Sequence, residues 1–175
     1  MRYSFFILLI VGLGSGWSTL AAQPSYVVLE TPKWLLQNQH NSYTVNIIGS
    51  DTDEVVDVWV AKMVAAGGTK IEGVKHEVLG YKNVVLPSIS KEPLQVYFRS
   101  YTDIEIASTH LTVWFRTKDS FISSSKMPMV SKAIHRLLIH FSFDMEDVVI
   151  SKDIKAADEL KAKELFPTSK PKPKH

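Results

Sequence analysis

The sequence of 175 residues contains no cysteine. This absence excludes disulfide bridges, a thiolate-ligated metal, a cysteine nucleophile and a lipid anchor attached to a thiol. Small extracellular domains of animals commonly rely on disulfides, because their cores are small and their compartment is oxidising. A chain without cysteine must instead be stabilised by its hydrophobic core.

An excess of charge of one sign is also missing, since 20 Lys and Arg face 18 Asp and Glu. Between residues 23 and 166 the balance is 16 basic against 18 acidic side chains, a net charge of −2. Domains that bind nucleic acid are usually strongly basic, so we expect no nucleic-acid partner. Phosphate-binding loops and dinucleotide fingerprints are absent as well, so we expect no cofactor.

A long apolar run occurs only near the N-terminus. Arg2 precedes an apolar segment over residues 5–13 and mostly small residues over 18–22. This order is typical of a secretory signal peptide and predicts cleavage after Ala21 or Ala22. The alternative is an uncleaved membrane anchor, although the apolar run is shorter than the ~20 residues of a spanning helix. We expect export to a bacterial periplasm or secretion, with membrane contact only before cleavage.

Three regions follow from this pattern. Residues 1–22 are the expected signal peptide, residues 23–166 a single α+β domain, and residues 167–175 a disordered Lys/Pro tail. Alternation of apolar and polar residues predicts a mostly antiparallel sheet of one-sided strands. The expected strands cover residues 26–29, 42–48, 69–72, 76–86, 93–101 and 106–116.

An amphipathic helix is expected after the early strands, over residues 51–66. Ser50 is a candidate N-cap, Val55, Trp59 and Met63 recur at four-residue spacing, and Gly67 is a helix stop signal. This helix should cover one face of the sheet.

The C-terminal region has no Gly, Pro or Asn from residue 129 to residue 166. Its stretch "LIHFSFDME" alternates as a strand does, but no turn signal precedes it, and Pro128 suits a first helical turn. We therefore predict one long helix with two apolar stripes. The stripe expected to pack on the sheet contains Val130, Ile134, Leu137, Leu138, Phe141, Met145, Val148 and Val149.

The second stripe consists of Ile139, Phe143, Ile150 and Ile154. Burial of each such side chain is worth about 1.5–3 kcal/mol, so we expect a surface to cover them. We expect residues 34–36 of the same chain to cover the first two. The same helix of a second copy, or another protein, is the expected partner of the last two.

Two short motifs resemble a known group of proteins. An apolar strand ending in "LPSIS" (residues 86–90), followed by "FISSS" (residues 121–125) ahead of a long C-terminal helix, is similar to exported bacterial α+β proteins whose function is not known. The resemblance implies a signal peptide, an antiparallel sheet and a long C-terminal helix, and it implies no catalytic residues.

The candidates for catalysis are weak. Ser123 and Lys126 form an S-x-x-K pattern, as in some acyl-transferring enzymes, but the accompanying S-D-N and K-T-G motifs are absent. His140, Asp144 and Asp147 share a helical face that could ligate a divalent metal, yet a solvated polar face explains them more simply. We expect no metal site.

Aromatic residues on the polar face of the strands are the remaining signal. Tyr97, Tyr101 and Trp114 could bind a glycan or a protein if they are exposed. The favoured alternative is that an extra helix or the segment 26–40 covers this face.

Taken with the second stripe, the sequence favours a non-enzymatic exported domain that acts through protein contacts. A glycan-binding or cell-wall-binding module and a small serine–lysine hydrolase remain as alternatives.

Overall fold

The computed structural model describes residues 26–74 and 77–165. The expected signal peptide and the expected Lys/Pro tail lie outside these described residues. Six strands form one antiparallel sheet in the order β1-β2-β6-β5-β4-β3, and two helices pack on it, as the predicted α+β class requires. The elements are β1 Val28–Leu35, β2 Asn38–Ile48, α1 Thr52–Ala65, β3 Thr69–Lys70, β4 Leu79–Val84, β5 Leu94–Asp103, β6 Ser108–Arg116 and α2 Pro128–Leu165.

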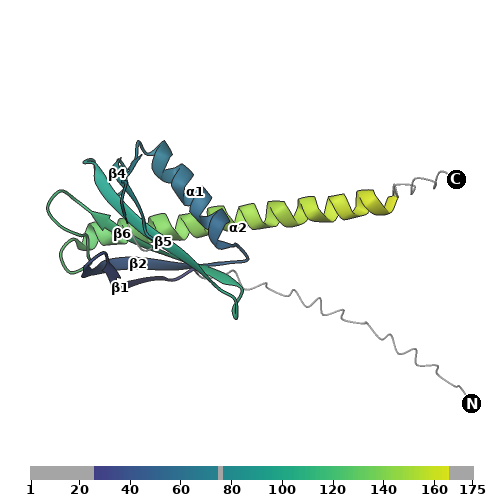
Figure 1. The fold of residues 1–175 in the computed structure, drawn as a ribbon, viewed down its shortest axis with the longest axis horizontal. Coiled ribbons are helices and arrows are strands. Elements are labelled where there is room, and N and C mark those ends of the chain that lie inside the picture. The colour runs from purple at the N-terminus through teal and green to yellow at the C-terminus, as the bar shows by residue number, and fades with distance from the viewer. Residues whose placement is uncertain (1–25, 75–76, 166–175) are drawn as a thin grey trace, which may run out of the picture.

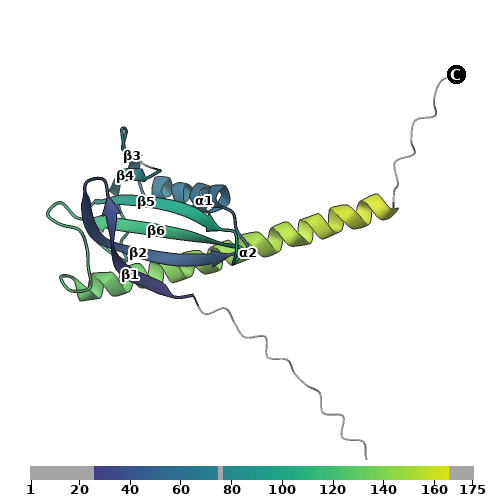
Figure 2. The same cartoon turned by 60° about the horizontal axis from the view of Figure 1, so that its bottom comes forward.

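Both helices cover the same face of the sheet, which we call the helix face. Figures 1 and 2 show α2 crossing the sheet and continuing well beyond its edge. Strand side chains alternate between two faces, so Tyr43, Val45 and Ile47 of β2 all reach the helix face and are fully buried. The predicted inward face of β2 is confirmed, but Ser42 and Thr44 on its other face are buried too, so this strand is not one-sided as expected.

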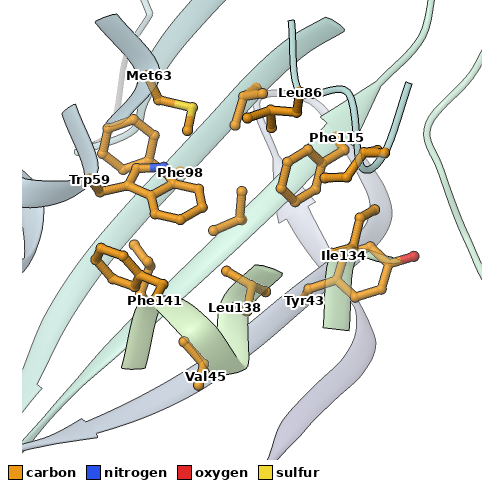
Figure 3. Close-up of a cluster of buried hydrophobic side chains, with 14 of the residues drawn as sticks. Tyr43, Val45, Trp59, Met63, Leu86, Phe98, Phe115, Ile134, Leu138 and Phe141 are labelled. Atoms are coloured by element: carbon orange, nitrogen blue, oxygen red, sulfur yellow. The ribbon is translucent and has the colours of Figure 1, made fainter. Parts of the chain in front are cut away.

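The core joins the two helices through aromatic contacts. The ring of Trp59 on α1 lies 4.9 Å from that of Phe141 on α2 and 6.3 Å from that of Phe98 on β5, in edge-on geometry (Figure 3). All three side chains are fully buried. Edge-on ring pairs add roughly 0.5–1.5 kcal/mol to the energy of burial itself.

The long C-terminal helix is confirmed, and "LIHFSFDME" is helical throughout. Its strand-like alternation arises because Phe141 and Met145 pack on the sheet, whereas Phe143 lies on the second, exposed stripe. Ser142 between them is buried as well. Ser142 is tolerated there because its hydroxyl donates to the carbonyl oxygen of Leu138 at 3.0 Å.

The start of α1 differs from the expectation. Asp51, not Ser50, is the N-cap, and its Oδ1 accepts from the backbone N–H of Glu54 at 2.8 Å. A carboxylate also suits the positive end of the helix dipole.

The first strand is longer than its sequence suggests. β1 continues through Pro32 to Leu35, because it lies at the sheet edge and pairs only with β2. Proline is tolerated on edge strands since its missing N–H can face away from the ladder. The tight turn to β2 places Leu36 at a φ of 56°, a backbone conformation that residues other than glycine rarely adopt.

The aromatic core contact makes a stability prediction that compares two phenylalanines on α2. Phe141→Ala removes a fully buried ring and should lower the free energy of unfolding by about 3–5 kcal/mol. Phe143→Ala changes a ring that is 44% exposed and should cost about 1 kcal/mol. Urea denaturation of both variants tests this, and equal losses would contradict the assignment of the two faces.

Candidate functional site

The first candidate surface is the second apolar stripe of α2. Ile139 is half-buried against the core, whereas Phe143, Ile150 and Ile154 are 44%, 49% and 59% exposed. At 100° per residue these side chains lie roughly opposite the stripe that packs on the sheet. The structure therefore separates the two predicted stripes of the helix.

The expected cover by residues 34–36 is wrong. Leu35 lies on the other face of the sheet, because its position in β1 points it away from the helices, and Trp34 and Leu36 are exposed. Tyr26 contacts the stripe instead, with its ring edge-on to Phe143 at 5.2 Å. The Tyr26 hydroxyl also donates to Glu146 on α2 at 3.4 Å.

Beyond Val149 the helix leaves the sheet. Val149 packs on Gly49, where an added Cβ would lie 3.3 Å from the Val149 side chain. Every residue from 150 to 162 is exposed, and the ion pair between Lys152 and Glu54 at 3.6 Å ties the helix to α1 at the point of departure. The projecting segment therefore has a free surface on all sides.

The second candidate surface is the sheet face opposite the helices, which we call the open face. The three predicted aromatic residues lie on it, but not as an exposed platform. Trp114 is fully buried and Tyr97 nearly so, whereas Tyr101 is 48% exposed and stacks on His110. Trp114 and Tyr97 are buried because they form a small second cluster with Leu35 and Val78. The alternative that this face is covered therefore holds for these two residues, and Leu35 of the segment 26–40 is part of the cover.

Cationic side chains lie above this cluster. The Lys33 amine donates to Thr44 Oγ1 at 2.9 Å and to Thr112 Oγ1 at 3.3 Å. The guanidinium of Arg99 lies 5.6 Å from the ring centre of Trp114. Partial burial, and then the nearby Arg99, lowers the pKa of Lys33. The two cations thus lie in the same region of the open face.

A hollow opens at one end of the open face, beside the β1–β2 turn. It has a volume of about 520 Å³ and includes Leu36, His40, Tyr97, Arg116 and Phe121 in its lining. His40 stacks on Phe121 with ring centres 3.8 Å apart, and the Arg116 guanidinium lies 5.6 Å from the centre of the same ring. Burial and then Arg116 lower the pKa of His40.

These cations were not predicted as a site. Arg99 and Arg116 occupy polar positions of alternating strands in the sequence, where isolated charges are ordinary. The available signal was that both fall on the same face as Tyr97, Tyr101 and Trp114. Strand pairing brings Lys33 and His40 to the same face as these two arginines. Their own strand sequences do not predict which strands lie beside them.

The Ser–Lys pattern does not form a reactive pair within the described residues. The Ser123 hydroxyl shares a hydrogen bond with Ser125 Oγ at 3.0 Å, no hydrogen bond joins it to Lys126, and Lys126 is exposed. No group of three or more His, Asp or Glu suited to a metal occurs in residues 26–74 and 77–165. Asp144 pairs with Lys62 at 3.3 Å instead.

Glu30 is the most connected carboxylate of the described chain, and it links the edge strand to the start of α2. Its Oε1 accepts from Asn41 Nδ2 and from the Ser124 backbone N–H, both at 2.8 Å, and its Oε2 accepts from Ser131 Oγ at 3.1 Å. Burial raises the pKa of Glu30, but these hydrogen bonds outweigh it and the pKa is lowered. All three partners are neutral groups of the same chain, so these hydrogen bonds tie the edge strand to the start of α2.

Searches against family models, curated proteins and solved structures returned no match to the chain. The resemblance to exported bacterial α+β proteins therefore stays a prediction. In the ranges 26–74 and 77–165, no helix has both the length and the apolar character needed to span a membrane.

Glu30 provides a prediction about pH. Its lowered pKa in the folded state means that its contribution to stability is complete above the ordinary value of 4.5 and is lost as the pH falls through the folded value. Glu30→Gln should cost about 1–2 kcal/mol at neutral pH, because the hydrogen bonds lose their charged acceptor.

Urea denaturation at pH 7 and pH 3 measures this effect. The difference in free energy of unfolding between Glu30→Gln and the original protein should be smaller at pH 3 than at pH 7. The exposed control Glu105→Gln should leave the free energy of unfolding unchanged at both pH values. A stability difference of the same size at pH 7 and pH 3 would contradict the role of the Glu30 charge.

Proposed function

We propose that the protein is an exported, non-enzymatic domain that acts through protein contacts, and that its contact surface is the solvent-facing stripe of α2. The observation that carries the proposal is the exposure of residues 150–162 in a helix with an apolar stripe. Export is supported by the signal-like residues 1–22.

The energetics favour a partner for this segment. Most helical stability in proteins comes from packing of an apolar face, and isolated helices shorter than about 12–15 residues are marginal in water. Apart from the ion pair between Lys152 and Glu54, no other part of the described chain packs on residues 150–162, and Ile150 and Ile154 are about half exposed. Burying them against another surface would stabilise both the segment and the complex.

The partner that we propose is a second copy of the chain, paired antiparallel about a two-fold axis at Ile154. On the helical wheel Asp147, Ile150, Ile154, Ala157 and Lys161 lie along one strip within about 80°. Asp147 and Lys161 are each seven residues from Ile154. An antiparallel copy therefore brings each Asp147 opposite the other Lys161.

The apolar residues are complementary in the same register. Residue 158 of the second copy lies directly opposite Ile150, and the adjacent Ala157 is the residue of the strip nearest to it, so that a large side chain packs beside a small one on both sides of the axis. The strip lies on the side of α2 away from the sheet, so the two sheets do not obstruct the pairing. Isologous pairing of this kind is the commonest form of protein dimer.

A charge exchange tests both the contact and its direction. Asp147→Lys and Lys161→Asp should each weaken the dimer, because each places like charges opposite one another twice. The double variant should restore the dimer, since antiparallel pairing re-forms both ion pairs. Analytical ultracentrifugation over a wide range of concentration measures the change.

Two further variants serve as test and control. Ile154→Lys puts two charges at the axis and should yield a monomer. Met129→Lys replaces an even more exposed apolar residue, 73% against 59% for Ile154, at the other end of α2 and should leave the dimer intact. If the original protein is monomeric at every concentration, a second copy of the chain is not the partner. If the double variant Asp147→Lys/Lys161→Asp does not form the dimer again, the antiparallel register is wrong.

A further inference from the structure

The open face of the sheet is rich in cations and poor in carboxylates. Strand residues that point to it include Lys33, His40, Arg99, His110 and Arg116, whereas Asp103 at the far end is the carboxylate among them. Ion pairs found in the described part of the chain join Lys62 to Asp144 and Lys152 to Glu54, both on helices. None of them neutralises Lys33, Arg99 or Arg116.

The central cations are held in place by neutral contacts. Thr44 and Thr112 hydroxyls lie 3.0 Å apart and both accept from Lys33, while Trp114 supports Arg99 from below. The Nε of Arg99 is buried and has no hydrogen-bond partner among the described residues. Glu77 lines a hollow with Arg99, yet it lies outside ion-pair distance. The pair is therefore ordered but not neutralised.

The hollow beside the β1–β2 turn holds the other cations. Arg116 and His40 both lie against the Phe121 ring, next to the amides of Gln37 and Asn38. The strained residue Leu36 forms part of the lining, and such strain in a structure is a pointer to function. A volume of about 520 Å³ lies in the range of small-molecule sites.

The two groups of cations are spaced along the same strands. Arg99 pairs across the sheet with Thr112, which lies four residues from Arg116 on β6. Four residues of an extended strand span about 13 Å. A ligand that reaches both groups must therefore be an extended molecule with more than one acidic group.

We propose that the open face binds an acidic oligosaccharide, with one sugar carboxylate held by Arg116 in the hollow and another held by Lys33 and Arg99. Arginine binds carboxylates in planar, two-pronged geometry. The exposed amides of Gln37 and Asn38 line the hollow and can pair with sugar hydroxyls, and the exposed Leu36 beside them offers an apolar contact.

Other polyanions fit the surface less well. An extended acidic peptide is usually held by main-chain hydrogen bonds at a sheet edge, whereas Arg99 and Arg116 lie on β5 and β6, which have a neighbouring strand on both sides. Lys33 lies on the edge strand β1. Nucleic acid is attracted by a strong positive field, but residues 23–166 carry a net charge of −2. The cations of the open face therefore attract an acidic group that lies next to them, without a strong positive field around the whole domain.

Binding of polygalacturonate fragments to the full chain tests the inference. We expect calorimetric binding that weakens about tenfold or more in Arg116→Gln and in Arg99→Gln, because each variant loses a charge-assisted contact. Lys132→Gln removes an exposed cation of α2 and should bind as the original protein does. Methyl-esterified fragments of the same sugar lack the charge and should not bind.

Several results would overturn the inference. These are absence of binding, equal binding of the esterified fragments, equal binding of polyglutamate or single-stranded DNA, and unchanged binding in Arg116→Gln. Thermal unfolding of each variant identifies any loss of folding. If Arg99→Gln disturbs the packing on Trp114 and destabilises the protein, Arg116→Gln remains the test of binding. Ile154→Lys should bind as the original protein does, so failure of the proposed dimer and failure of this site are distinguishable.

Discussion

The contact between Trp59 and Phe141 is the interaction on which the arrangement of the molecule depends. It joins two helices that are far apart in the sequence and holds both on the same face of one antiparallel sheet. Because both helices pack on that face, no helix within residues 26–74 and 77–165 covers the other face of the sheet. The same packing directs α2 across the sheet and beyond its edge (Figure 2).

These two consequences give the molecule two different free surfaces. The open face is stabilised by the small cluster around Trp114, which supports cations instead of presenting aromatic rings to solvent. The apolar strip of α2 is centred on Ile154, with the Asp147 carboxylate seven residues before it and the Lys161 amine seven residues after it. The first surface suits a charged, extended ligand, and the second suits another helix. In the antiparallel pair that we propose, two open faces would belong to one particle, which would raise its effective affinity for a polymer with repeated acidic groups.

Much of the fold was predictable because local pattern and tertiary environment agree. Strands β2, β5 and β6 alternate in sequence as they do in space, and the absence of helix breakers after residue 129 predicted α2. The errors have physical causes. Pro32 suggested the end of a strand, but an edge strand accepts it, and Ser50 suggested a cap that the adjacent Asp51 provides with a charged acceptor.

What the sequence by itself determined is the class of the fold, the two stripes of the long helix, and the lack of any cysteine-based chemistry. These follow from periodicity and composition, which act over a few neighbouring residues. Only the tertiary structure decided that Trp114 is buried, that Tyr26 and not Leu35 contacts the second stripe, and that Lys33 and His40 join Arg99 and Arg116 on one surface. Those outcomes depend on which strands pair and in what register, and pairing across long separations in the sequence is decided by the packing of the whole domain.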